Sequence, residues 1–220
     1  MKVLWIIGIG TFGLLAADRL EKVYPHHNLV LVDTVKKHLI RAKGLNRSLK
    51  NTDGVSYLLS NLHPGKGPDW IIPALPVHLL AEWTIARLKP EGFERIRIPG
   101  EAMKCLPNLI EGKNGDVYVS HADFICPDDC PEPGNVCYVT GQKRKRNMFD
   151  LLNEIKLPGF HPIVVRSHQL APGVGGYRPE KLFQVLQQIS ETKTAILLIT
   201  ACRCHGVITG VISKKHASNP

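Results

Sequence analysis

The chain has 220 residues, of which 44% are hydrophobic and 21% are charged, as is ordinary for a globular protein. No apolar run reaches the roughly 18 residues of a membrane helix without interruption, so we expect no membrane span. The formal net charge of +9 favours anionic partners such as dinucleotides. Its one dense basic run, residues 143–146, is typical of a solvated loop, and we do not expect nucleic-acid binding.

The first 33 residues carry the pattern of a dinucleotide-binding unit. An apolar run at residues 3–7 leads into Gly8, Gly10 and Gly13, which fit G-x-G-x-x-G. Apolar residues recur at helical spacing from Phe12 onward, and a proline ends this pattern. A second apolar run at residues 29–32 then ends in Asp33. In such a unit the glycines hold the pyrophosphate and the acidic residue holds the ribose, so the sequence predicts NAD binding.

Two other interpretations of this stretch stay open. Residues 1–17 are apolar after Lys2 and could be a secretory signal peptide, although cleavage would then destroy a strand–helix–strand pattern that continues beyond them. The unit could also be a Rossmann fold that binds no nucleotide, because fold alone does not imply function.

The next stretch predicts the rest of a doubly wound parallel sheet. We expect a helix over residues 35–42, strands at 54–59, 69–72 and 93–98, and a helix over 77–88. His78, near the start of that last helix, would face the nicotinamide and could act in catalysis. Polar, loop-rich sequence then places a domain boundary at 112/113, which divides a Rossmann domain (1–112) from a smaller Cys/His-rich α/β domain (113–220).

Unusual residues follow three strands expected in the second half. Strands at residues 117–125, 162–166 and 195–200 alternate with helices at 148–155 and 179–189, and one more strand is expected at 206–212. Parallel strands present their carboxyl ends at one edge, where ligands bind. The segments that follow the three strands would therefore meet, and they carry Cys126, Cys130, Cys137, His168, Cys202, Cys204 and His205.

Clustered thiolates favour a soft metal, and we expect zinc or an iron–sulfur cluster. Four ligands would suffice, with His168 or His205 as substitutes for a cysteine, from the set Cys126, Cys130, Cys137, Cys202 and Cys204. The spacing matches no standard zinc finger or ferredoxin, so free thiols, a redox pair and, in a secreted protein, disulfides remain alternatives. Cys105 stands apart and is interpreted as a bystander. His168 and His205, with His121, are the acid–base candidates because imidazole exchanges a proton near neutral pH.

Residues 6–13 (IIGIGTFG) and 29–33 (LVLVD) resemble the TrkA-N or RCK domains of bacterial potassium-transport regulators. The resemblance implies a cytoplasmic Rossmann domain that binds NAD(H), often as a homodimer. It covers about one sixth of the chain, since the acidic G-D-A-T segment of that family is missing and the cysteine-rich half is foreign to it. The second half also carries CPDDCPEP and TACRCHG, which indicate a small family of its own.

The leading hypothesis is a cytoplasmic NAD(H)-binding redox protein that couples the nucleotide to a cysteine-liganded centre and to a small-molecule substrate or redox partner. The alternative is a non-catalytic nucleotide sensor whose cysteine site is structural or redox-sensing. A binding module that uses the basic surface is a third.

Overall fold

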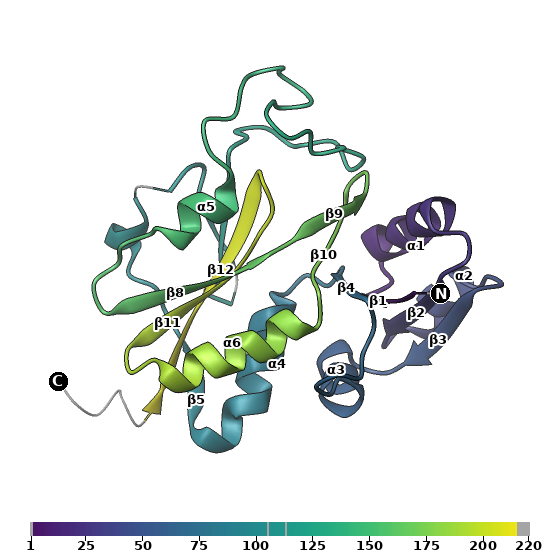
Figure 1. Ribbon diagram of the computed structural model, residues 1–220, viewed down its shortest axis with the longest axis horizontal. Helices are drawn as coiled ribbons and strands as arrows, with labels where there is room; N and C mark the ends of the chain where they lie inside the picture. Colours follow the sequence, from purple (N-terminus) through teal and green to yellow (C-terminus); the bar gives the residue numbers. More distant parts are fainter. Residues whose placement is uncertain (1, 105, 113, 215–220) are drawn as a thin grey trace.

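A computed structural model describes residues 2–104, 106–112 and 114–214. Two larger β-sheets lie side by side, with helices packed between and around them, and β9 (His168–Ala171) and β10 (Val174–Gly176) form a separate two-stranded hairpin (Figure 1). The chain is therefore an α/β protein, with a parallel sheet at its N-terminal side and a mixed sheet at its C-terminal side. No helix in the described ranges is long and apolar enough to cross a membrane.

The first sheet is parallel, with strand order β3-β2-β1-β4. Apolar residues alternate between its two faces: Leu4 and Ile6 pack under α1 and α2, whereas Trp5 and Ile7 pack under α3 and α4. The sheet is thus covered on both faces, as the continuous apolar strands predicted. Its elements are β1 (Val3–Ile7), α1 (Thr11–Val23), β2 (Asn28–Asp33), α2 (Lys36–Arg41), β3 (Arg47–Asn51), α3 (Gly54–Asn61), β4 (Trp70–Pro73) and α4 (Leu79–Leu88).

The strand predicted at residues 54–59 is wrong, because these residues form α3. Asp53 caps this helix by accepting a hydrogen bond from the Ser56 N–H at 2.8 Å. A Cβ on Gly54 would lie 2.3 Å from the Ile7 side chain, so glycine permits the helix to start against β1. The actual third strand, β3, is a polar edge strand, and its sequence RSLKN gave no apolar signal.

The second sheet has the order β6-β7-β12-β11-β8, and β5 also pairs with β12. Only β8 and β11 are parallel neighbours, because β12 runs antiparallel to β11, β7 and β5. The carboxyl ends of β7, β8 and β11 consequently point to one edge, where β12 begins. The remaining elements are η1 (Lys89–Glu91), β5 (Phe93–Ile96), η2 (Gly100–Met103), β6 (Ile110–Glu111), β7 (Val117–Ser120), α5 (Met148–Asn153), β8 (Phe160–Arg166), β9 (His168–Ala171), β10 (Val174–Gly176), α6 (Glu180–Glu191), β11 (Ala195–Ala201) and β12 (His205–Ser213).

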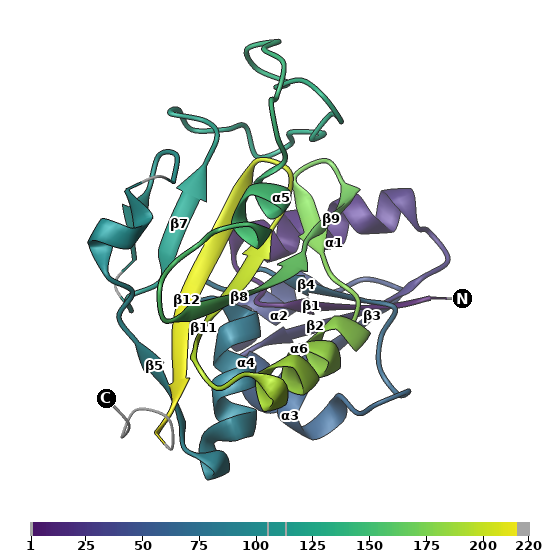
Figure 2. The ribbon, with the colours of Figure 1, turned by 60° about the vertical axis from the view of Figure 1, so that its left-hand side comes forward.

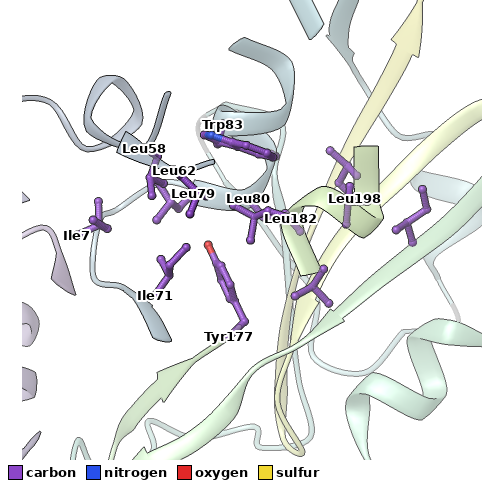
Figure 3. Packing of buried hydrophobic residues seen from close by; sticks show 14 of the residues in the cluster. Ile7, Leu58, Leu62, Ile71, Leu79, Leu80, Trp83, Tyr177, Leu182 and Leu198 are labelled. Atoms are coloured by element: carbon purple, nitrogen blue, oxygen red, sulfur yellow. The ribbon is translucent and has the colours of Figure 1, made fainter. Parts of the chain in front are cut away.

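The two sheets share one hydrophobic core. Ile7 and Ile71 from the first sheet join a buried cluster with Leu198 of β11 and Leu182 of α6 (Figure 3). Tyr177, just after β10, exchanges backbone hydrogen bonds of 2.9 and 3.0 Å with Ile71 of β4. Strand pairing divides the chain between β4 and β5, whereas the predicted domain boundary lay at 112/113.

Residues 121–147, here named the cysteine segment, join β7 to α5 without a helix or strand of their own. They run over the top of the molecule above α5 and β9 (Figure 2). The segment contains Cys126, Cys130 and Cys137, while Cys202 and Cys204 lie in the turn between β11 and β12. This edge of the second sheet, next to α1, is where the candidate site lies.

Candidate functional site

The glycine loop has the backbone that the G-x-G-x-x-G spacing predicts. Gly8 has φ of +95°, and a Cβ there would lie 2.7 Å from the Ala74 carbonyl oxygen, so only glycine fits the turn. A Cβ on Gly13 would lie 1.9 Å from the Gly8 carbonyl oxygen, so glycine allows α1 to pack directly on the loop. Both positions therefore require glycine for the fold itself.

Gly10 differs, because a Cβ there would meet no atom within 4 Å. It is the N-cap of α1, and the helix start has neither a side-chain cap nor an acidic residue in its first turn. Open space at a helix N-terminus suits the approach of a phosphate, since the first N–H groups of a helix have no partner within it. Packing does not explain this glycine, whereas approach by a ligand would.

Asp33 ends β2 and turns its carboxylate toward the glycine loop. Its two oxygens accept hydrogen bonds from the backbone N–H groups of Ile9, at 2.6 Å, and Val35, at 2.7 Å. Burial acts to raise the pKa of Asp33, but these bonds and the nearby His38 together hold it below its ordinary value. The residue is therefore a carboxylate at neutral pH, placed beside the loop.

A pocket of about 880 Å³ opens beside this loop at the common edge of the second sheet. Phe12, in the first turn of α1, is 69% exposed and forms part of its wall, so it does not lie on the buried face that helical spacing predicted. Ser167 and Gln169, at the start of the β9–β10 hairpin, form another part. All five described cysteines line the pocket, together with His121 and His205: Cys126, Cys130, Cys137, Cys202 and Cys204.

Contacts from the first half of the chain hold the cysteine segment in place. Arg19 of α1 donates to the Asp128 carbonyl oxygen at 2.7 Å and to its carboxylate at 3.1 Å. The Cys130 carbonyl oxygen accepts from Gly173 N–H at 2.9 Å and from the Gln169 amide at 2.7 Å. The helix of the glycine loop and the tip of the β9–β10 hairpin thus position the loop between Cys126 and Cys130.

The β11–β12 turn contacts the same segment through charged side chains. Glu132, at φ of +47°, accepts a hydrogen bond from the Arg203 N–H at 2.6 Å. Arg144 donates to the Cys204 sulfur at 3.0 Å and to the Gly134 carbonyl oxygen at 2.8 Å. Arg144 belongs to the basic run that looked like a solvated loop, yet its guanidinium joins the segment to the turn.

The thiols at the pocket have unequal acidity. Burial, followed by the Glu132 carboxylate, raises the pKa of Cys202 to about 12. Burial also raises the pKa of Cys126 and of Cys204, although Arg144 opposes the rise at Cys204. Hydrogen bonds from the hydroxyl and N–H groups of Thr140 lower the pKa of Cys137, which makes it the most easily ionised of these four thiols.

The three predicted catalytic histidines lie in different places. His205 lines the pocket, with its Nδ1 3.9 Å from the Cys202 sulfur, and burial lowers its pKa. His168 instead packs edge-on against Trp70 at 5.5 Å and is not part of the pocket wall, because neighbouring residues of a strand face opposite ways. The sequence predicted that His168 would share a site with the cysteines, and this geometry does not place it there.

The position predicted for His78 is wrong: it is 3% exposed and does not face the crevice. Its ring nitrogens contact Thr209 at 2.8 Å and Thr200 at 2.9 Å, and Thr209 in turn donates to Asp116. Burial lowers the pKa of His78 to about 4, with Asp116 opposing and Arg95 adding to the shift. His78 is a neutral member of a buried polar network behind the second sheet.

The pocket brings the cysteines together without forming a metal-binding geometry. Over residues 2–104, 106–112 and 114–214, no group of three or more His, Cys, Asp or Glu side chains is arranged to hold a metal ion. The described cysteines are all free thiols. Cys105, the expected bystander, lies outside the described residues.

Phe12, Arg19 and Arg144 are site residues that the sequence did not single out. Each acts across a long separation, and Arg19 meets Asp128 from 109 positions away. The sequence signals of these residues were a helical apolar position, an ordinary surface arginine and a basic run. None of these signals points to a pocket.

Fold and site define an α/β protein in which a Rossmann-type glycine loop borders a cysteine-lined pocket built on a second, mixed sheet. Residues 80–214 match the family model AF_1314_C, described as "Uncharacterized protein, C-terminal domain". The chain is also 30% identical over 225 residues to an "Uncharacterized protein" of Archaeoglobus fulgidus, covering 94% of this chain and 97% of that protein. The chain therefore belongs to this family, and no solved structure matches it.

The family match begins inside α4 and includes the second sheet, the cysteine segment and the β11–β12 turn. It leaves out the glycine loop, so the resemblance of the first residues to TrkA-N and RCK domains stays a prediction. The relative from Archaeoglobus covers almost the whole chain, which indicates that the two halves occur together in both proteins.

Proposed function

We propose that the protein binds NAD(H) at the glycine loop and that the nicotinamide end of the nucleotide reaches the cysteine-lined pocket. One observation carries this proposal: Phe12, two residues beyond Gly10, is itself part of the pocket wall. A pyrophosphate at the open N-terminus of α1 would place one half of the dinucleotide beside Asp33 and the other beside Phe12. The pocket, at about 880 Å³, has room for a ring and a further small molecule.

In this proposal the protein is a redox protein. NADH would be oxidised to NAD⁺, releasing two electrons and one proton, and an electron acceptor bound in the pocket would be reduced. His205 and His121 line the pocket as neutral imidazoles, because burial lowers the pKa of each, and they could accept or deliver the proton. His168 and His78 have no part in this proposal, since neither lines the pocket.

A second candidate function, a nucleotide sensor without catalysis, is favoured by the contact between Arg19 and Asp128. This contact ties the helix of the glycine loop to the cysteine segment, so nucleotide binding at α1 could be passed to that segment. Wild-type protein that binds NADH and never oxidises it with any acceptor dye would favour the sensor over the redox protein.

Calorimetric titration with NADH and NADPH tests the proposal. Gly10→Val should weaken NADH binding at least a hundredfold, since its side chain would occupy the space left for the pyrophosphate. The matched control is Gly100→Val, because a Cβ on Gly100 would also meet no atom within 4 Å and the residue lies outside the loop. Absence of binding to either nucleotide, or equal binding by both variants, would show the proposal to be wrong.

A further inference from the structure

Four of the five cysteines that line the pocket are linked by electrostatic interactions, with Cys126 in common. The Cys126 thiol interacts with those of Cys130, Cys137 and Cys204, and the Cys204 thiol also interacts with that of Cys130. These residues come from the loop held by Arg19, from a hairpin-like turn around residue 140, and from the β11–β12 turn. Three separate stretches therefore bring free thiols to the lining of a single pocket.

One of these four sulfurs has a charged donor aimed at it. The Cys204 sulfur accepts from the Arg144 guanidinium at 3.0 Å. A guanidinium donor suits a thiolate, which is the form in which cysteine binds a metal.

Cys202 has different surroundings. Its sulfur accepts from the backbone N–H groups of Cys204 and His205, each at 3.4 Å, so it holds the β11–β12 turn together. The Glu132 carboxylate, which accepts a hydrogen bond from the N–H of the adjacent residue Arg203, would repel a thiolate in that place. The fifth cysteine of the pocket thus has a structural position that the other four lack.

We propose that Cys126, Cys130, Cys137 and Cys204 bind one thiophilic metal centre, a zinc ion or an iron–sulfur cluster, and that Cys202 is not a ligand. Four thiolates are a sufficient donor set for either centre. Because no preformed metal geometry exists among the described residues, binding draws the cysteine segment toward the β11–β12 turn. The segment is held by individual hydrogen bonds and has no helix or strand of its own, so this closure would break no element.

The charge around the four thiols fits the same centre. Four thiolates around a divalent zinc carry a net charge of −2, and Lys143, Arg144 and Lys145 all line the pocket. Asp128 is paired with Arg19, so the charge of this nearby acid is already balanced. The metal site goes beyond nucleotide binding and does not depend on it.

The test is anaerobic purification of the full chain, followed by metal and sulfide analysis after reconstitution with zinc alone or with iron and sulfide. Wild type should hold one centre, and the arm that succeeds distinguishes zinc from a cluster. The serine variants of Cys126, Cys130, Cys137 and Cys204 should each lower metal affinity at least tenfold in competition with a chelator. Cys202→Ser is the matched control, and this variant should bind one full equivalent of the metal centre per chain.

Circular dichroism melting of each variant separates loss of a ligand from failure to fold, with the metal-free wild type as reference. A folded Cys202→Ser protein that loses metal as the other four do would overturn the ligand assignment. Wild-type protein that takes up neither zinc nor a cluster would overturn the site itself. Calorimetry with NADH on the same samples reports nucleotide binding separately, so one proposal can fail while the other holds.

Discussion

The glycine loop is held within the first sheet by its own backbone, Asp33 and Ala74, whereas the cysteine segment is held by side-chain contacts with other elements. Gly8 and Gly13 meet within one turn, and a Cβ on the second would clash with the carbonyl of the first. Asp128 is held by Arg19 across 109 positions, and Glu132 accepts from the Arg203 N–H across 71. The packing of the first sheet therefore shapes the loop, while the position of the segment depends on the assembled fold.

The largest expected effect lies within the glycine loop. Gly13→Ala should destabilise the fold by roughly 3 kcal/mol or more, because its Cβ would lie 1.9 Å from a backbone oxygen that cannot move aside. Gly10→Ala should cost about 1 kcal/mol or less, since space is open there and only the N-cap changes. Chemical denaturation of both variants measures the difference, and equal losses would contradict the assigned roles of these glycines.

The pH dependence of the free energy of unfolding tests the comparison at His78, which is buried by residues distant from it in the chain. The folded pKa of about 4 lies below the ordinary 6.5, so the folded state binds fewer protons than the unfolded chain between these values. The contribution of neutral His78 to the free energy of unfolding is complete above pH 6.5. It declines as the pH falls toward 4, by an amount on the order of 3 kcal/mol. Unfolding curves of His78→Gln should lack this decline, and parallel pH dependences for variant and wild type would refute it.

Removing the link between the two regions should have a more modest effect. Arg19→Ala deletes both bonds to Asp128 and should cost about 1–2 kcal/mol, felt mainly as faster hydrogen exchange and proteolysis in residues 121–147. The control is Arg41→Ala, an exposed arginine near the end of α2. Identical exchange rates in the segment for both variants would mean that α1 does not hold it.

The smallest expected effect concerns the choice of nucleotide. Asp33 carries a negative charge beside the loop and should disfavour the 2′-phosphate of NADP(H). Asp33→Asn keeps the shape and should reduce the preference for NADH over NADPH about tenfold, roughly 1.4 kcal/mol. Competitive titration measures the ratio, and a wild-type preference for NADPH would contradict this role.

The parts of the molecule that the sequence predicted correctly depend on short-range patterns. The spacing of Gly8, Gly10 and Gly13 and the apolar run that ends in Asp33 fixed β1, α1 and β2, because each pattern lies within one strand–helix–strand unit. The convergence of Cys126 and Cys204 followed from the shared direction of β7 and β11.

The errors have long-range causes. His78 was assigned to the crevice from its place at a helix start, but Thr200 and Thr209, more than 120 positions away, bury it. The position of β12 between β7 and β11, antiparallel to both, could not be predicted locally. The apolar pattern of a strand does not indicate its direction in the sheet. Residues 54–59 were apolar enough for a strand, but they form α3, whose first residue, Gly54, packs against Ile7 of β1, 47 positions away.

Alkylation of the pocket cysteines in metal-free protein, followed by mass spectrometry with and without NADH, tests the central claim that the glycine loop and the pocket act on one ligand. We expect saturating NADH to slow modification of Cys126, Cys137 and Cys204 in wild type and to have no effect in Gly10→Val. Binding of NADH seen by calorimetry, with unchanged alkylation of all three thiols, would show that the nucleotide does not reach the pocket and would contradict the account.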